Sequence, residues 1–311
     1  MPFWPEVLRA AHEEDPFSTM VISRPGARDA ASDPARGILT VLTGLDSGRV
    51  VRVEARPVTL GRSVDCTLCL ADQGLSRVHA QVLREGIQYT LEDRGSRNGT
   101  FVNGRRITHK ALLHSGDRIA IGAETEVKFS VVSPSEHQTL EQTYEKATTD
   151  GLTGLYNRSQ LDQRLAHHVQ VARRESQPLA LAILDVDHFK KVNDTHGHLA
   201  GDEVLRRLGQ LMREFAEPGE MPARYGGEEF VFVGRYTDAL LHGLRTDQIR
   251  QRLGAMTFPL ASGGVLQVTC SAGVAGLDEV PESGGVSALL GLADERLYQA
   301  KQAGRNRVIG P

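Results

Sequence analysis

The pattern of apolar and polar positions divides the chain into regions with different periods. Between residues 38 and 132, short apolar runs alternate with glycine, aspartate, serine and asparagine. The clearest runs lie at residues 38–42, 50–53, 78–83, 89–92 and 126–132. Many short strand-like runs with turn residues between them are typical of a β-sandwich or barrel. We therefore expect an all-β domain over residues 38–132.

From residue 150 to residue 311, strand-length and helix-length segments alternate. The strand-like runs lie at residues 179–185, 230–233, 266–273 and 307–309. The helical patterns cover residues 158–174, 201–215, 238–255 and 286–303. This alternation indicates an α/β or α+β domain.

Two further segments flank the first domain. Residues 1–37 hold five of the 13 prolines and no sustained apolar period, so we expect a flexible tail. In residues 133–149, Leu140, Tyr144 and Ala147 fall on one helical face, which predicts a short linker helix suited to pairing.

Composition narrows the class of protein. The 311 residues are 40% hydrophobic, which is enough for two packed cores and excludes general disorder. A net charge of −3 argues against a chain that coats nucleic acid or an anionic membrane. The longest apolar run, residues 179–184, is far shorter than the ~18 residues of a spanning helix, and no signal peptide is visible. Three cysteines do not make a disulfide framework, so we expect a cytoplasmic protein without membrane insertion.

Side chains that bind phosphate gather in the turns of the first domain. They are Arg62, Ser76, Arg77, Arg97 and Asn98. Arginine offers forked donors, serine a hydroxyl donor, and asparagine pairs with peptide backbone. A single loop arginine is more simply a solvated surface residue, but the cluster predicts a phosphate receptor.

The spacing of these residues resembles that of the forkhead-associated (FHA) domain. The motifs are GR at 61–62, SRVH at 76–79, NGT at 98–100, GD at 116–117 and IG at 121–122. By this resemblance, Arg62, Ser76 and Arg77 contact phosphothreonine, while Arg97 and Asn98 contact the adjoining peptide. His79 and Gly99 then support the loops. The implied partners are a phosphothreonine peptide and a Ser/Thr kinase.

The pair Cys66 and Cys69 raises the alternative of a metal or redox site. A zinc site needs about four ligands, and the chain has no second cysteine pair. The alternation of apolar residues through this stretch suits a strand better, so we expect a structural role.

Carboxylates mark two places in the second domain. Asp185 and Asp187 end an apolar run, and Glu228 and Glu229 follow a Gly-Gly pair that predicts a hairpin. Clustered carboxylates repel unless cations lie between them, and Mg²⁺ with a nucleotide phosphate fills that role. The alternative is a solvated acidic turn.

Longer motifs favour the metal site over the solvated acidic turn, because they resemble those of a known family. They are DGLTGLYNR at 150–158, DVDHFKKVNDTHGHLAGD at 185–202, GGEEF at 226–230 and YQAKQAGRN at 298–306. Together they closely resemble the GGDEF domain of diguanylate cyclases, over residues 150–309. The implied fold is a ferredoxin-like palm of the nucleotidyl-cyclase type, an α/β domain that follows the all-β FHA sandwich.

The resemblance assigns roles to individual residues. The metal, Mg²⁺ or Mn²⁺, is held by Asp185, the Val186 carbonyl and Glu228, with Glu229 at a second metal position. Glu228 activates the 3′-hydroxyl, and Lys301 and Arg305 neutralise the β- and γ-phosphates. The GTP site further includes the backbone N–H groups of the DHFK turn and the side chains that read the base. These residues are His188, Phe189, Lys190, Asn193, His198 and Asp202.

The base-reading position has a chemical reason. Guanine presents two neighbouring N–H donors, and an ionised aspartate only accepts hydrogen bonds, so Asp202 favours GTP over ATP. The implied reaction joins two GTP into cyclic di-GMP with release of pyrophosphate. One site holds one GTP, so we expect an active homodimer. The alternative is a catalytically silent receptor or adaptor.

Two regulatory expectations concern single segments. Many GGDEF domains carry an inhibitory Arg-x-x-Asp ahead of the hairpin, but here residues 217–220 place Glu217 at the arginine position. We therefore expect no tight product inhibition there. In the tail, Thr19 has an aliphatic residue, Ile22, three positions later, as FHA ligands often do. Phospho-Thr19 is a candidate ligand of the chain's own FHA domain.

Overall fold

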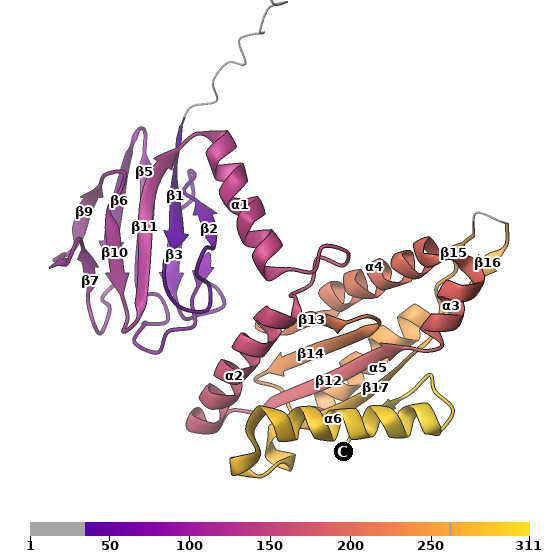
Figure 1. The fold of residues 1–311 in the computed structure, drawn as a ribbon. Coiled ribbons are helices and arrows are strands. Elements are labelled where there is room, and N and C mark those ends of the chain that lie inside the picture. The colour runs from indigo at the N-terminus through magenta and orange to yellow at the C-terminus, as the bar shows by residue number, and fades with distance from the viewer. Residues whose placement is uncertain (1–34, 261–262) are drawn as a thin grey trace, which may run out of the picture. The chain divides into compact units, whose positions relative to one another are not determined.

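The computed structural model describes residues 35–260 and 263–311. Thr19 therefore lies outside the described residues. Strands dominate the first part of the described chain, and helices and strands alternate in the second part (Figure 1). No helix among the described residues combines the length and the apolarity needed to cross a membrane.

The first domain is a sandwich of two open sheets, which confirms the all-β prediction. The six-stranded sheet has the order β2-β1-β11-β10-β7-β8, and the five-stranded sheet has the order β4-β3-β5-β6-β9. Strands of the first sheet are β1 (Arg36–Val41), β2 (Val50–Arg52), β7 (Thr100–Val102), β8 (Arg105–Arg106), β10 (Arg118–Ile121) and β11 (Thr125–Val132). Strands of the second are β3 (Val58–Gly61), β4 (Leu68–Cys69), β5 (Ala80–Glu85), β6 (Gln88–Asp93) and β9 (Lys110–Leu113).

Period-two alternation builds the core of this sandwich. In β11, Val127 and Phe129 are buried while Lys128 between them is exposed. Leu60 of β3 and Leu91 of β6, from the other sheet, join the same buried cluster. One apolar face of each sheet therefore packs on the other, and the turns remain free for binding.

Helix α1 (Pro134–Thr148) follows the sandwich. Its start is encoded locally, because the Ser133 side chain accepts a hydrogen bond from the Glu136 amide and Pro134 occupies the first turn. The buried residues are His137 and Thr148, while Ala147, on the face predicted to suit pairing, is exposed. His137 Nδ1 lies 3.1 Å from a guanidinium nitrogen of Arg52 in β2, so the start of the helix packs on the sandwich.

The second domain is a five-stranded sheet with helices on both faces (Figure 1). The strand order is β13-β14-β12-β17-β18, antiparallel except for β17 with β18. The strands are β12 (Leu179–Val186), β13 (Met221–Gly226), β14 (Glu229–Arg235), β17 (Cys270–Gly276) and β18 (Val308–Ile309). The helices are α2 (Arg158–Glu175), α3 (Phe189–His196), α4 (His198–Phe215), α5 (Ala239–Gly254) and α6 (Gly285–Gln302). A small hairpin joins β15 (Phe258–Pro259) and β16 (Val265–Leu266).

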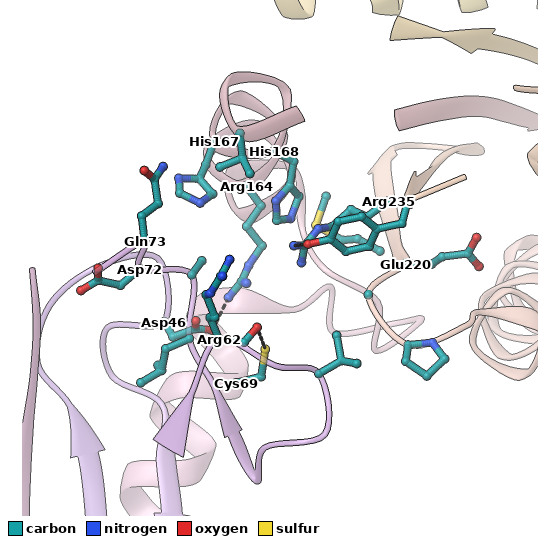
Figure 2. A pocket seen from close by; sticks show the side chains of 18 of the residues that line it. Asp46, Arg62, Cys69, Asp72, Gln73, Arg164, His167, His168, Glu220 and Arg235 are labelled. Carbon is teal, nitrogen blue, oxygen red and sulfur yellow. Dashed lines mark hydrogen bonds and ion pairs between the residues drawn. The ribbon is translucent and has the colours of Figure 1, made fainter. Parts of the chain in front are cut away.

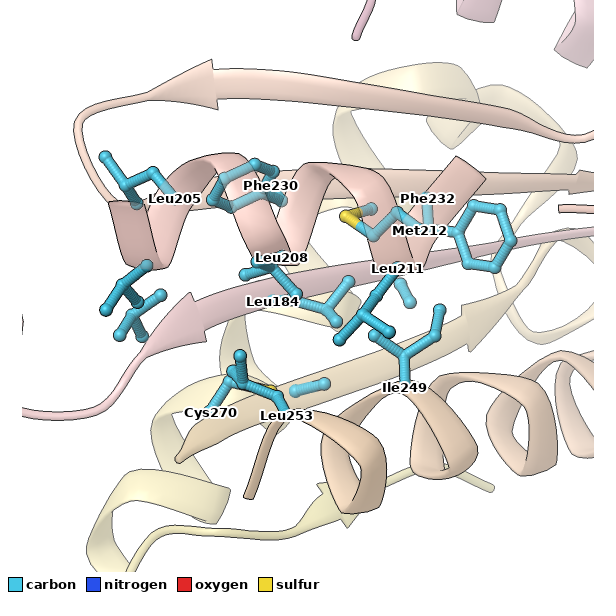
Figure 3. Close-up of a cluster of buried hydrophobic side chains, with 14 of the residues drawn as sticks. Leu184, Leu205, Leu208, Leu211, Met212, Phe230, Phe232, Ile249, Leu253 and Cys270 are labelled. Carbon is cyan, nitrogen blue, oxygen red and sulfur yellow. The ribbon is translucent and has the colours of Figure 1, made fainter. Parts of the chain in front are cut away.

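Strand β12 explains the longest apolar run of the sequence. All eight of its residues are buried, because helices cover both faces of the sheet. Ala182 and Leu184 join the core under α4 and α5, and Leu181 and Ile183 join the core under α2 and α6. Figure 3 shows the first of these cores. It also contains Cys270, a free and fully buried thiol of β17.

The predicted strand at residues 266–273 is wrong as a single element. The chain there ends β16 at Leu266 and begins β17 only at Cys270. Thr269 lies in the gap and donates its hydroxyl to Asp187, so a polar contact interrupts the run.

Candidate active site

The register of the central sheet brings the predicted carboxylates together. Asp185 near the end of β12 pairs with Glu229 at the start of β14. The turn that precedes Glu229 contains Gly227, at φ +50°, and Glu228. The Val186 amide donates to the Glu228 carbonyl at 3.4 Å, which ties the hairpin to the strand end.

These carboxylates repel each other in a partly dry site. Burial raises the pKa of Asp185, against a hydrogen bond from Lys301 that lowers it. Burial also raises the pKa of Glu228, and the nearby charge of Asp185 raises it further. Lys301 Nζ lies 3.0 Å from Asp185 Oδ1. The site therefore favours an added cation.

The donor set fits a hard divalent cation. Among the described residues, no three His, Cys, Asp or Glu side chains lie close enough to hold a metal by themselves. Two carboxylates and one carbonyl are nevertheless typical of Mg²⁺ sites, where substrate phosphates and water supply the other oxygens. Asp185, Glu228 and the Val186 carbonyl would hold such an ion.

Asp187 has a different role from Asp185. Its Oδ1 accepts the Ser271 hydroxyl at 2.7 Å, and its Oδ2 accepts the Thr269 hydroxyl at 2.6 Å and the Asn306 amide at 3.0 Å. The side chain is buried and turned into the fold. Asp187 therefore fixes the end of β12 to the turn after α6.

That turn carries the second predicted cation. Arg305 lies just beyond α6 at φ +63°, and its charge is near enough to Asp185 to lower the pKa of that carboxyl. Together with Lys301 in the last turn of α6, it places two positive charges beside the carboxylates. This arrangement suits a polyphosphate bound between the two groups.

Backbone amides form the predicted phosphate cradle at the start of α3. His188 adopts a left-handed conformation, at φ +57°, and no side chain caps the helix that follows. The first amides of a helix lack partners within the helix, so those of Phe189 and Lys190 remain available to an anion.

The predicted base-reading residues lie on α3 and α4. Asn193 Oδ1 is buried, and no group of the described residues donates a hydrogen bond to it. A Cβ on Gly201 would lie 2.0 Å from that oxygen, so a larger residue there would displace the Asn193 side chain. Asp202 follows Gly201 and is half-buried, while His198 at the first position of α4 is exposed. A buried acceptor without a partner fits a site for an N–H donor of a ligand.

A support for the hairpin was not assigned by sequence reasoning. Arg224 donates from Nη1 to both carboxylate oxygens of Asp150, at 3.2 and 3.1 Å. Its Nε and Nη2 donate to the Gly227 carbonyl at 3.1 and 2.7 Å. The motif that opens the domain is thereby joined to the turn that carries Glu228. Asp150 opens the first of the GGDEF-like motifs and Arg224 lies two residues ahead of GGEEF, but only the fold shows that they meet.

The FHA loops form a second site of different construction. The Ser76 amide donates to His79 Nδ1 at 3.2 Å, and the other ring nitrogen of the fully buried His79 lies 3.1 Å from the Gly99 carbonyl oxygen. The Arg97 amide donates to Ser76 Oγ at 3.1 Å. One buried histidine therefore joins two loops.

The remaining predicted peptide contacts lie on the same loops. The Arg62 amide donates to the Ser76 carbonyl at 3.1 Å, and Asn98 Nδ2 donates to the Gly74 carbonyl at 2.8 Å. The side chains of Arg62, Arg77 and Arg97 are exposed. Cys66 and Cys69 are free thiols that donate to the Arg77 and Arg62 carbonyls, at 3.2 and 3.6 Å.

Comparison with known proteins supports both resemblances. Residues 58–122 match the model of the FHA domain, and residues 147–307 match the model described as diguanylate cyclase, GGDEF domain. The chain is 41% identical over 172 residues to the diguanylate cyclase DgcP of Pseudomonas aeruginosa and 43% identical over 176 residues to the response regulator PleD of Caulobacter vibrioides. Each match covers 55% of this chain, but only 25% of DgcP and 37% of PleD.

Solved structures resemble the second domain in the same way. The coiled coil and GGDEF domain of DgcB from Caulobacter crescentus, in complex with c-di-GMP, is 32% identical with a TM-score of 0.53. That match covers 57% of this chain and 92% of the DgcB chain. The diguanylate cyclase SiaD of Pseudomonas aeruginosa, in complex with its activator SiaC, is 31% identical with a TM-score of 0.51, covering 57% of this chain and 66% of that chain. Because the GGDEF match spans more than half of the chain, the chain belongs to the GGDEF family of diguanylate cyclase domains.

Proposed function

We propose that the protein condenses two GTP molecules into cyclic di-GMP and pyrophosphate, under the control of a phosphothreonine peptide bound by its FHA domain. The observation that carries the catalytic part is the cluster of Asp185, Glu228 and Lys301. Its carboxylates have raised pKa values in a partly buried site beside two cations. Mg²⁺ or Mn²⁺, when bound there, would offset that repulsion and bind phosphate oxygens.

The chain's own residues then have definite tasks. The amides at the start of α3 and the side chains of Lys301 and Arg305 hold the triphosphate, so that the α-phosphate lies near the strand end. Asn193 and Asp202 orient the guanine. Glu228 accepts the proton of the attacking 3′-hydroxyl, and its raised pKa makes it a stronger base than an ordinary glutamate. The 3′-oxygen forms a bond to the α-phosphorus, and the bond to pyrophosphate breaks.

The product requires two such sites. Each site as described holds one GTP, whereas cyclic di-GMP contains two nucleotides joined by reciprocal bonds. The active species is therefore a homodimer in which two half-sites face each other. Helix α1, directly ahead of the cyclase domain, is the element that would control this pairing.

The catalytic proposal is tested on the purified chain. Incubation with GTP and Mg²⁺ or Mn²⁺ is expected to give cyclic di-GMP and one equivalent of pyrophosphate per bond formed, measured by chromatography and a coupled pyrophosphate assay. A chain that binds GTP but forms neither product would instead be a nucleotide receptor or an adaptor, and the proposal would be wrong.

The regulatory proposal concerns the FHA loops. Arg62, Ser76 and Arg77 would bind the phosphate, and Arg97 and Asn98 the adjoining peptide. Thr19, modified by a Ser/Thr kinase, is the proposed ligand within the chain, docking on its own or the partner's FHA domain. Because phospho-Thr19 and the FHA domain belong to the same chain, the effective concentration of this ligand would be roughly millimolar.

This proposal is tested by phosphorylating the wild type, Thr19→Ala and Arg62→Ala and comparing their cyclase rates. Stimulation of the wild type alone is expected. If Thr19→Ala responds as the wild type does, the switch is not at Thr19. If Arg62→Ala responds normally, the FHA pocket does not read the modification.

A further inference from the structure

A cavity of about 300 Å³ lies next to Arg62, and none of the active-site residues line it. On one side it is lined by Asp46 of the β1–β2 turn and by Arg62, which follows β3. On the other side it is lined by Arg164 and His168 of α2 and by Arg235 at the end of β14 (Figure 2). The cavity therefore has walls from the FHA domain and from the cyclase domain.

A buried ion pair holds these walls together. Arg164 Nη2 donates to Asp46 Oδ1 at 2.8 Å and to the Leu45 carbonyl at 3.3 Å. The two side chains are only 9% and 7% exposed. The Arg164 guanidinium also lies over the Tyr156 ring, 4.8 Å from its centre. Breaking one half of such a pair is costly, because the other charge stays buried without a partner.

The carboxylates that line the cavity are already engaged. Asp46 holds Arg164, and Asp72 accepts hydrogen bonds from the Gly74 amide and from the chain at residues 123–125. Glu220 is held by Arg245, and Glu175 lies 3.3 Å from Arg174. Three of these acids therefore have an arginine partner, whereas Asp72 keeps its negative charge, because only amides and the Thr125 hydroxyl donate to it.

Two lining arginines remain without an acidic partner. Within the described residues, no carboxylate lies at ion-pair distance from Arg62 or Arg235. Arg235 has only the hydroxyl of its neighbour Tyr236, at 2.9 Å. His168 adds no positive charge, because burial lowers its pKa to about 3. The lining holds four arginines and four acids, but Glu175 and Glu220 are paired with Arg174 and Arg245 from outside it. Arg62 and Arg235 therefore remain available to an anion.

Cys69 lines the same cavity as the two arginines. The Cys69 thiol donates to the Arg62 carbonyl at 3.6 Å (Figure 2). Burial raises the pKa of that thiol, and the charge of Arg235 is near enough to oppose the effect. Because Arg62 and Arg235 line one cavity, a peptide with its phosphate at Arg62 could extend a neighbouring residue into the space that Arg235 faces.

We propose that this cavity binds an acidic residue that flanks the phosphothreonine, so that Arg235 of the cyclase domain is a second reader of the FHA ligand. This inference rests on the proposed function of the FHA domain. Its ligand class is an acidic phosphothreonine peptide. The peptide would contact both domains at once, and its sequence preference would depend on a residue outside the FHA domain.

The test uses the full chain and a peptide library with phosphothreonine fixed and degenerate positions on either side. The wild type is expected to enrich Asp and Glu at one flanking position. Arg235→Gln should lose that enrichment and bind the best acidic peptide about tenfold more weakly, the value of one hydrogen-bonded charge pair. Arg252→Gln is the matched control, because it removes one exposed, unpaired arginine of the same domain outside the cavity.

The outcomes separate the inference from the function on which it rests. If peptide binding depends on Arg62 but the wild type shows no acidic preference, Arg235 is not a second reader. The same holds if Arg235→Gln keeps the acidic preference. In both cases the FHA assignment stands. If the wild type binds no phosphothreonine peptide, or if Arg62→Ala binds as well as the wild type, both the FHA assignment and the role of Arg235 are wrong.

A second measurement tests whether the cavity depends on the ion pair between Asp46 and Arg164. Arg164→Glu opposes a carboxylate to Asp46, so it should abolish the acidic preference while phosphothreonine binding persists. The reversed pair, Asp46→Arg with Arg164→Asp, should restore the preference. Retention of the preference in Arg164→Glu would contradict a cavity built from both domains.

Discussion

The two regions of this chain that we propose to bind phosphate are organised in opposite ways. In the cyclase domain, like charges are gathered in a partly buried cluster, and the pKa values of Asp185 and Glu228 are raised as a result. In the FHA domain, Arg62, Arg77 and Arg97 are exposed and free of carboxylate neighbours among the described residues, and a buried histidine and backbone bonds hold their loops. The first site needs cations and substrate to become stable, whereas the second is complete before its ligand arrives. Catalysis benefits from the former, and selective recognition benefits from the latter.

The largest effect is expected from the carboxylates. Asp185→Ala, Glu228→Ala and Glu229→Ala should each lower the rate of cyclisation by about 10²–10⁴-fold, the usual contribution of a positioned acid–base group. Melting temperatures of Glu228→Ala and Glu229→Ala should not fall, because each change relieves repulsion between carboxylates, whereas Asp185→Ala also removes the ion pair with Lys301. Pyrophosphate release and thermal unfolding measure the two quantities. Near-native turnover in Asp185→Ala would remove this residue from the metal site.

The next effect concerns the support of the hairpin. Arg224→Ala should lower the cyclisation rate at saturating GTP by about 10–100-fold, because the turn that carries Glu228 loses its tie to Asp150. GTP affinity should change little, since Arg224 lies outside the phosphate cradle. Asp150→Ala should add little to Arg224→Ala in a double-mutant cycle. Arg206→Ala, which removes an exposed pair with Glu203, is the control. Fully additive losses would show that the two residues act separately.

On the FHA side, a residue that touches no ligand should matter. His79→Ala leaves the Ser76 amide and the Gly99 carbonyl without their partner, at a cost of about 1–3 kcal/mol for each buried group. Phosphothreonine peptides should bind at least about tenfold more weakly, measured by fluorescence anisotropy. The basal cyclase rate should not change. Unaltered peptide binding in a folded His79→Ala protein would show that the loops keep their shape without this histidine.

A smaller effect concerns stability and pH. The pKa of Glu228 is raised in the folded state above its ordinary 4.5, so the folded state binds the proton more tightly than the unfolded state. The stability from this proton is complete below pH ~4.5 and is lost as pH rises through the raised value. In the absence of divalent cations, Glu228→Gln should therefore melt at a higher temperature than wild type at pH 7, with the gap closing toward pH 4. A lower melting temperature at pH 7 would mean that the glutamate is stabilised as an anion.

The smallest expected effect is that of added product. Glu220, at the aspartate position of the inhibitory motif, has a side chain only 1% exposed and pairs with Arg245 and His242. Glu217 replaces the arginine that would bind phosphate. Submicromolar cyclic di-GMP should leave the initial rate unchanged. Tight inhibition that disappears in Glu217→Ala would contradict this prediction.

The fold was predictable wherever one period dominated a segment. Strand β12 is buried on both faces, so its sequence is a continuous apolar run, and β11 is buried on one face, so its apolar residues alternate. Both patterns predicted the correct element. Helix α3 was missed, because its eight residues are largely polar and it begins after a residue at positive φ. Helix α4 begins at His198, ahead of the predicted start at residue 201, because Leu199 in its first turn is exposed and does not belong to the buried apolar face that marked the helix.

The candidate site was predictable in its residue types but not in its supports. Asp185, Glu228 and Lys301 stood out through long motifs, and the structure brings them together. The burial of Asp187 and the three donors it accepts depend on β17 and on the turn after α6, which no local pattern encodes. The unpartnered charge of Arg235 likewise emerges only when the lining of the cavity is known.

Cys270 gives the cyclase domain a built-in reporter. Its thiol lies on β17 opposite Val186, fully buried beneath the catalytic end of β12, and burial raises its pKa far above the usual range. A thiol reagent in solution reaches such a group only when the strand pair opens. The rate at which Cys270 is labelled therefore measures how often β12 and β17 separate beside the candidate active site. A bound nucleotide that holds β12 and β17 together would lower the rate of Cys270 labelling in the unmutated protein.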